Sequence, residues 1–298
     1  MTFGKNHIPA GSAEAPFAVA LTQEAAGWDH CSLHVLELGR GETRRLHSRS
    51  DEIVVVPLAG SALVASGGES CELAGRASVF DGPTDFAYVG RDSSYTLTTT
   101  TGGRFALGGA KAQRRLPFRY VPAAEVAIEL RGAGNCSRQV HNFATADTFD
   151  AEAIIACEVL TPSGNWSSYP AHKHDELTAH ETPLEEIYYF EFAPDTTDSA
   201  PDPDAGFGYH RVYGTADRPI DVLAEVRAGD VVLVPHGYHG PSTAAPGYHM
   251  YYLNIMAGPG PQRSWRISDD PAHTWVRDTW AGMPVDPRLP LAAKETRR

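Results

Sequence analysis

The segment from Pro170 to Phe192, PAHKHDELTAHETPLEEIYYFEF, holds the residues whose types and spacing suit them to chemistry. His172 and His174 are separated by one residue, and in a β-strand such residues point to the same face. Two imidazoles directed into one space form half of a metal site. We expect His239 and Glu186 to supply a third imidazole and a carboxylate. This donor set suits zinc, manganese, iron or nickel, and spacing alone does not choose among them.

Strand alternation decides which carboxylate we expect in the site. It puts Leu184, Glu186, Tyr188 and Phe190 on one face of the segment LEEIYYFEF, whereas Glu185 points the other way. Glu186 is therefore the preferred ligand. The competing residues in the sequence are the carboxylates Glu176, Glu181 and Glu185 and the imidazoles His180 and His236.

The run GDVVLVPHGYH combines a glycine turn, an apolar strand and a proline that ends the strand before His239. Together with His-x-His it resembles the two motifs of the cupin β-barrel family, in which Gly229, Pro235 and Gly237 fall at the family spacing. Two details depart from that pattern. Glu186 lies farther from the His-x-His pair than usual, and His239 comes one residue early.

Composition limits the classes of partner. The chain has 298 residues, of which 42% are hydrophobic, and this is enough to bury a core. Its formal charge of −12 argues against nucleic acid or an anionic membrane as partner. The four cysteines show no CxxC spacing, and the N-terminal segment has no apolar core of a signal peptide. We therefore expect a cytoplasmic protein that acts on a small molecule. Association into a homo-oligomer stays open.

Short β-rich segments separated by Gly, Asp or Ser run through the whole chain and predict an all-β sandwich or barrel fold with few short helices. The first half carries a degenerate copy of the motif pair, in which His47 precedes Glu52 but Arg49 occupies the position of the second histidine. We expect no metal there. The predicted parts are an N-terminal arm (1–27), a first cupin barrel (28–125), a connector (126–150) and a second, metal-holding barrel (151–298).

The connector includes the turn-like stretch RGAGNCSRQVHN, from Arg131 to Asn142. Its charged and amide groups can contact a substrate or form a solvated linker, and we favour the linker.

Seven separated blocks resemble the 5-deoxy-glucuronate isomerase family of myo-inositol catabolism, and they cover nearly the whole chain. They are SVFDGPTDFAYV, RGAGNCSRQVHN, NWSSYPAHKHDE, LEEIYYFEF, GFGYHRVY, GDVVLVPHGYH and GYHMYYLNIMAGP. The family is a bicupin, built from two tandem jelly-roll-like β-sandwich barrels, and is related to 5-keto-4-deoxyuronate isomerase. The resemblance implies a divalent metal, with zinc as the expectation and manganese, iron or nickel as alternatives. Its ligands would be His172, His174, Glu186 and His239. Gly240, His236 and His249 depart from the family pattern near the site.

The implied reaction converts 5-deoxy-D-glucuronate, an aldose, to the ketose 5-dehydro-2-deoxy-D-gluconate. A proton must leave the carbon beside the aldehyde, and a metal stabilises the enediolate that forms. A hydride shift is the alternative route. Besides the ligand Glu186, the candidate bases are Glu185, Asp175, Tyr188 and a hydroxide held by the metal. The candidate substrate contacts are Arg211 for the carboxylate, with Tyr213 and Tyr252. A cupin dioxygenase using Fe(II) and a non-catalytic sugar-binding cupin are the competing functions.

Overall fold

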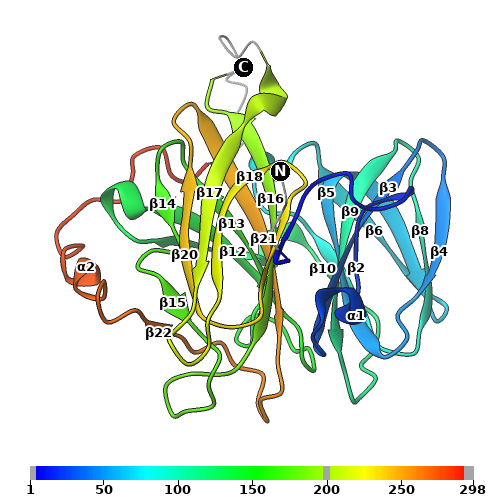
Figure 1. Cartoon of the computed structure of the whole chain (residues 1–298). Helices are drawn as coiled ribbons and strands as arrows, with labels where there is room; N and C mark the ends of the chain where they lie inside the picture. Colours follow the sequence, from blue (N-terminus) through cyan, green and yellow to red (C-terminus); the bar gives the residue numbers. More distant parts are fainter. Residues whose placement is uncertain (1–4, 197–201, 292–298) are drawn as a thin grey trace.

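The computed structural model describes residues 5–196 and 202–291. Nearly all regular structure is β, as Figure 1 shows, with two one-turn α-helices, α1 (Gln23–Ala26) and α2 (Trp275–Asp278), in the described residues. Four 3-10 turns cover Val79–Asp81, Ala123–Glu125, Gly134–Cys136 and Pro203–Ala205. No helix in the described part of the chain has the length and apolar character needed to cross a membrane.

The first half of the chain forms a nine-stranded sheet that curls on itself. Its main path is β10-β7-β5-β9-β3-β2, and the long strand β5 also pairs with β6 and β8, while β8 pairs with β4. The strands are β2 (Phe17–Leu21), β3 (Cys31–Leu38), β4 (Thr43–His47), β5 (Asp51–Ser66), β6 (Glu69–Arg76), β7 (Phe86–Val89), β8 (Ser94–Thr98), β9 (Gly103–Lys111) and β10 (Arg119–Val121).

The second half forms two sheets. The seven-stranded sheet has the order β1-β19-β16-β21-β13-β12-β11, and the six-stranded sheet has the order β18-β17-β20-β15-β22, with β14 beside β20. The strands of the first sheet are β1 (His7–Ile8), β11 (Ala127–Arg131), β12 (Arg138–Ala144), β13 (Ile155–Thr161), β16 (Glu185–Pro194), β19 (Val231–Val234) and β21 (Tyr248–Ala257). Those of the second are β14 (Trp166–Ser167), β15 (His172–Lys173), β17 (Phe207–Tyr213), β18 (Asp221–Arg227), β20 (Tyr238–Ala244) and β22 (Ser268–Asp269).

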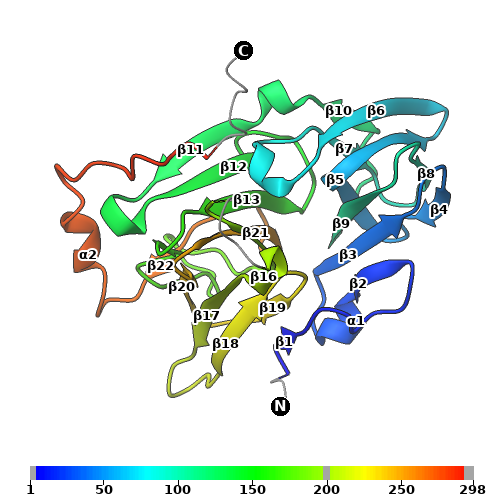
Figure 2. The same cartoon turned by 90° about the horizontal axis from the view of Figure 1, so that it is seen from above.

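Three of these strands lie where the sequence predicted other structure. β11 and β12 fall within the predicted connector, but they form an antiparallel hairpin at the edge of the seven-stranded sheet. β1 belongs to the predicted arm and pairs with β19 of the second half, and Figure 2 shows it beside β19. The division of the chain into four parts at the three predicted boundaries stays a prediction.

The central strands of the seven-stranded sheet, β13, β16, β19 and β21, are buried on both faces, which explains their runs of aromatic and β-branched residues. One face of β16 presents Tyr188 and Phe190 to the interior of the second barrel. The other presents Ile187 and Tyr189 to a core shared with Val54 and Val56 of β5 in the first half. The two halves therefore pack sheet against sheet, with the strands of each side by side in Figure 1.

Each half supplies one glutamate that accepts hydrogen bonds from the backbone of the other half. Glu185, at the start of β16, accepts hydrogen bonds from the backbone N–H groups of residues 29, 30 and 31 at 2.9, 2.8 and 3.1 Å. Glu52, near the start of β5, accepts from the backbone N–H groups of residues 152, 153 and 154 at 2.9, 2.6 and 2.6 Å. Glu52 of the degenerate motif thus has the same kind of backbone contacts as Glu185, and it is not the counterpart of Glu186. The residue that follows it, Ile53, packs inside the first barrel.

A buried ion pair also joins the halves. Arg76 of β6 donates to both carboxylate oxygens of Glu158 of β13 at 2.8 and 2.7 Å. His141 adds a contact from its Nδ1 to Glu158 Oε2 at 3.2 Å. All three side chains are at most 3% exposed.

Candidate metal centre and arginine-lined cavity

Three imidazoles converge at one end of the second barrel. His172 lies in β15 and is directly opposite His239 of β20 in the antiparallel pair. The strand alternation places His174 on the same side as His172. The ligand atoms of the three histidines lie within 4.8 Å of one another. All three side chains are buried, so the histidines that the sequence singled out are brought together.

Glu186 completes the cluster from the start of β16. Its Oε2 lies 2.9 Å from His174 Nε2 and 3.0 Å from His239 Nε2. Burial alone would raise the pKa of Glu186, but the imidazoles of His239 and His174 hold it well below its usual range. The residue is only 1% exposed. A buried carboxylate is thus in contact with two of the three imidazoles.

Two of the imidazoles are oriented by a contact of Nδ1 with a backbone carbonyl, which leaves Nε2 to act as the ligand atom. His174 Nδ1 lies 3.2 Å from the carbonyl oxygen of Leu184, and His239 Nδ1 lies 3.2 Å from that of Gly237. When each Nδ1–H donates to its carbonyl, the Nε2 lone pairs face the cluster, as is usual for metal-binding histidines. His239 Nε2 is buried and forms no hydrogen bond of good geometry within the described residues, although it lies 3.0 Å from Glu186 Oε2. Burial, with the charges of His239 and His174, lowers the pKa of His172 and favours its neutral form. The residues therefore fit a divalent ion.

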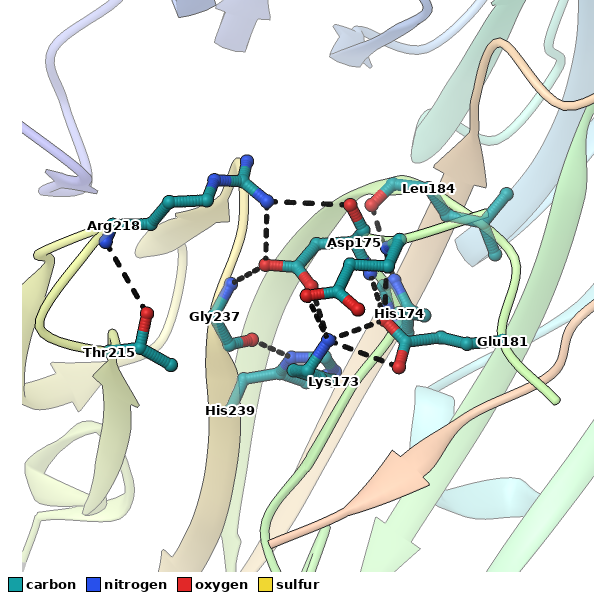
Figure 3. Close-up of polar contacts among 10 residues, drawn as sticks. Lys173, His174, Asp175, Glu181, Leu184, Thr215, Arg218, Gly237 and His239 are labelled. Atoms are coloured by element: carbon teal, nitrogen blue, oxygen red, sulfur yellow. Dashed lines mark hydrogen bonds and ion pairs between the residues drawn. The ribbon is translucent and has the colours of Figure 1, made fainter. Parts of the chain in front are cut away.

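The competing carboxylates have other partners. Lys173 Nζ lies 2.8 Å from Asp175 Oδ1, 3.2 Å from Glu176 Oε1 and 2.9 Å from Glu181 Oε1, and Figure 3 shows Lys173 between Asp175 and Glu181. Glu181 also accepts from the backbone N–H groups of residues 175 and 176. These contacts hold together the loop that separates His174 from Glu186. His180, the competing imidazole in this loop, is exposed.

Asp175 is held by several donors. Besides Lys173, it accepts from Arg218 at 3.0 Å and from the backbone N–H of Gly237 at 2.9 Å. Burial raises the pKa of Asp175, but Lys173 and the Gly237 N–H outweigh this and lower it. An acid with a lowered pKa is a poor base. Glu185, another candidate base, faces the first half of the chain with both oxygens engaged.

Tyr188 and Tyr252 lie inside the barrel, with ring centroids 5.0 Å apart. Their hydroxyl groups are 3.3 and 3.1 Å from Ser168 Oγ, and the Tyr188 ring is 6.1 Å from His239. Burial and the charge of Glu186 raise the pKa of Tyr188, which keeps the phenol protonated. Gly240 packs so closely here that a Cβ would come 1.8 Å from the carbonyl oxygen of Ser168.

His210 of β17 is a buried residue that the sequence-based prediction missed. Its Nδ1 lies 2.5 Å from Ser242 Oγ, and its Nε2 has no hydrogen-bond partner in the described part of the chain. Its ring lies 4.4 Å from that of Tyr188, at an angle of 42°. Burial, with the charge of His239, lowers its pKa to about 3. His210 and Val212 are both buried in β17. The alternation of this strand could therefore have indicated from the sequence that His210 faces the interior.

The same alternation turns Arg211 and Tyr213 away from the triad. Arg211 donates to Asp221 at 2.6 Å, and Tyr213 donates to Asp270. Both line a separate depression with Tyr169 and Leu223. The structure therefore does not bring these two predicted substrate contacts to the site, whereas Tyr252 lies within the barrel.

A cavity of about 360 Å³ opens beside the triad. His172 lines it together with Arg131, Arg138, Arg277, Trp265 and Asp269. The antiparallel pairing of β11 and β12 sets Arg131 opposite Arg138. The sequence favoured a solvated linker for these two residues. Two arginines flanking the turn GAGNCS were the available signal.

A family model, described as the KduI/IolB family, matches residues 7–276. Relatives named 5-deoxy-glucuronate isomerase include one from Geobacillus thermodenitrificans (strain NG80-2), 41% identical over 264 residues that cover 88% of this chain and 91% of the relative. Another, from Bacillus subtilis (strain 168), is 39% identical over 245 residues that cover 81% and 86%. These relatives confirm the resemblance seen in the sequence.

Solved structures show the same fold. A crystal structure of an IolB-like protein from Salmonella typhimurium LT2 has a TM-score of 0.82 and 34% identity, and covers 91% of this chain and 98% of its own. Oxalate decarboxylase from Lactobacillus farciminis has a TM-score of 0.63 at 13% identity and covers 90% and 89%, a likeness in fold alone. The predicted all-β bicupin fold is confirmed.

Proposed function

We propose, since the chain belongs to the KduI/IolB family, that it is a metal-dependent aldose–ketose isomerase. Its substrate would be 5-deoxy-D-glucuronate and its product 5-dehydro-2-deoxy-D-gluconate, in myo-inositol catabolism. The relatives at about 40% identity carry the name of this activity. The observation that supports it most is the cluster of three buried imidazoles, two of which contact Glu186, beside a cavity large enough for a sugar acid.

His172, His174, His239 and Glu186 would hold the ion. We propose zinc, with manganese, iron or nickel as the alternatives that this donor set also suits. When bound, a divalent ion would polarise the sugar carbonyl and stabilise negative charge that develops beside it. The carbonyls of Leu184 and Gly237 keep two of the imidazoles in their ligating orientation. The burial of the cluster limits access of water.

Of the proposed catalytic residues, Glu186 and Tyr188 face the interior of the barrel, and Glu185 does not. Glu186 would hold the ion through its carboxylate. Tyr188, kept protonated by burial, would donate its O–H to a sugar oxygen or to the hydroxyl cluster with Ser168 and Tyr252. Because its raised pKa keeps the phenol protonated at neutral pH, we assign Tyr188 the role of hydrogen-bond donor and not that of base.

Tyr188→Phe is expected to retain the bound metal and to lower kcat by about 100-fold, the lower range of effects of proton-donating groups. The readouts are metal content and steady-state kinetics on 5-deoxy-glucuronate. Tyr189→Phe, on the opposite face of β16, is the matched control and should leave kcat nearly unchanged. If Tyr188→Phe turns over like the wild type, the ring serves packing alone.

The proposed function as a whole is tested by metal analysis of the purified protein, combined with an assay on 5-deoxy-glucuronate with and without O2. We expect about one divalent ion per chain and equal turnover in both atmospheres. A strict requirement for O2 would favour a cupin dioxygenase instead. Stoichiometric metal without any turnover would favour a sugar-binding cupin.

A further inference from the structure

The cavity beside the triad carries positive charge that the protein does not balance. Arg131 is paired with Glu129, its Nε and Nη2 donating at 2.9 and 2.7 Å. Arg277 is paired with Asp269 through two of its nitrogens. Arg138 forms no ion pair with any carboxylate within residues 5–196 and 202–291. Its Nη1 donates to the backbone carbonyl of Cys136 at 3.0 Å.

The position of Arg138 is costly for stability. Its side chain is buried, with 6% exposure, and a buried charge without a partner is unfavourable. Arg131 lies directly opposite it across the hairpin of β11 and β12, and like charges in such a pair destabilise a sheet. Burial, with the charges of Arg131 and Arg277, lowers the pKa of Arg138 to about 10 although Tyr252 opposes this. The guanidinium still carries its charge at neutral pH.

We infer that Arg138, flanked by Arg131 and Arg277, binds the carboxylate of the sugar acid. This inference rests on the proposed function and orients the substrate within it. Two of the three guanidinium groups are already neutralised, so one net positive charge remains for one carboxylate. A guanidinium fork binds a carboxylate with two parallel hydrogen bonds, and burial strengthens them. His172 lines the same cavity, so a bound carboxylate leaves the aldehyde end of an open-chain sugar beside the triad.

Arg138 therefore takes the role that the sequence predicted for Arg211. It selects uronates over neutral sugars and does not take part in proton transfer. Arg211, paired with Asp221 on the outer side of the six-stranded sheet, supplies a matched control because it is an arginine of the same half outside the cavity.

The first test compares 5-deoxy-D-glucuronate with 5-deoxy-D-glucose, in which a hydroxymethyl group replaces the carboxylate. Arg138→Met is expected to lower the acid-to-neutral ratio of kcat/KM by about 10- to 100-fold, the loss of a charge-assisted hydrogen-bonded pair, mainly through KM. Arg138→Lys keeps the charge without the fork and should recover part of the ratio. Arg211→Met should leave the ratio unchanged.

Two further measurements separate recognition from a structural role. Metal content should be unchanged in Arg138→Met, and its unfolding temperature should be at or above that of the wild type because a like-charge contact is removed. An unchanged ratio, or equal losses on both sugars together with a lower unfolding temperature, would overturn the inference.

A binding measurement distinguishes failure of the carboxylate site from failure of the proposed function. Trp265 lines the cavity, and Trp280 lies against Arg138, so tryptophan fluorescence reports on its occupancy. In the metal-loaded protein, D-glucuronate should change this fluorescence in a saturable way and D-glucose should not, and Arg138→Met should abolish the difference. If the wild type fails to isomerise 5-deoxy-glucuronate but shows this selective binding, the proposed function fails and the carboxylate site stands. If it isomerises the acid but Arg138→Met behaves like the wild type in both assays, the carboxylate site alone fails.

Discussion

His174→Ala is expected to remove both the bound metal and the isomerisation of 5-deoxy-glucuronate. His174 is 1% exposed and contacts Glu186 at 2.9 Å, so its loss opens the donor set and leaves a buried carboxylate with one imidazole contact fewer. We expect kcat/KM to fall by about 1,000-fold or more, in line with the several kcal/mol that a metal contributes to such a reaction. Metal analysis and initial rates on the same preparation measure the two losses.

His180→Ala is the control for this variant. His180 belongs to the same loop but is exposed, so its removal should leave metal content and rate unchanged. A His174→Ala protein that lacks metal and still turns over at the wild-type rate would contradict the mechanism. Restored turnover on adding excess zinc to His174→Ala would show that three donors suffice to hold the ion.

Arg76→Met is expected to destabilise the fold strongly. It leaves Glu158 fully buried with only His141 beside it, and breaking a buried pair in this way costs about 3–5 kcal/mol in the free energy of unfolding. Denaturant titration at neutral pH measures this cost. Arg227→Met is the control, because Arg227 and Glu225 form an exposed pair and its loss should cost less than about 1 kcal/mol.

The double variant Arg76→Met/Glu158→Met tests the cause. Because both charges are then absent, it should be more stable than Arg76→Met alone. A double variant as unstable as the sum of the single changes would show that packing, and not an unpaired charge, sets the cost.

The same pair gives a pH dependence with a defined sign. Burial raises the pKa of Glu158, but Arg76 and His141 outweigh this and hold it at about 2, below the ordinary value of 4.5. The pair therefore stabilises the folded state fully above pH 4.5 and loses this contribution as the pH falls towards 2. In Arg76→Met the carboxylate can be protonated more readily, so the difference in stability from the wild type should shrink on acidification.

Periodicity and motif spacing were sufficient to predict which histidines meet. The His-x-His alternation and the Gly-Pro-Gly spacing before His239 are local properties of strands and turns, and the structure brings these three imidazoles together with Glu186. The assignment of all four as metal ligands stays a prediction, as does the identity of the ion.

The substrate side of the site could not be predicted in the same way. Whether Arg138 or Arg211 faces the cavity depends on which edge a hairpin joins and on the register of β17, and both are set by long-range pairing. Arg138 lies 34 residues before His172 in the chain, with no local pattern to connect them. The partners of Glu52 and Glu185 are likewise about one hundred or more residues away.

Glu52 and Glu185, which each bond to the backbone of the opposite half, bear on whether either half of the chain can fold alone. In each half, three consecutive backbone N–H groups, those of residues 29–31 and 152–154, donate to a glutamate of the other half. Separating the halves would also expose the apolar sheet faces that form the shared core. In an isolated half, three of these amide groups would lose their carboxylate acceptor. We therefore expect the joined pair to be the smallest unit that folds on its own, and the second half expressed alone, although it contains every proposed ligand, to be neither stably folded nor active.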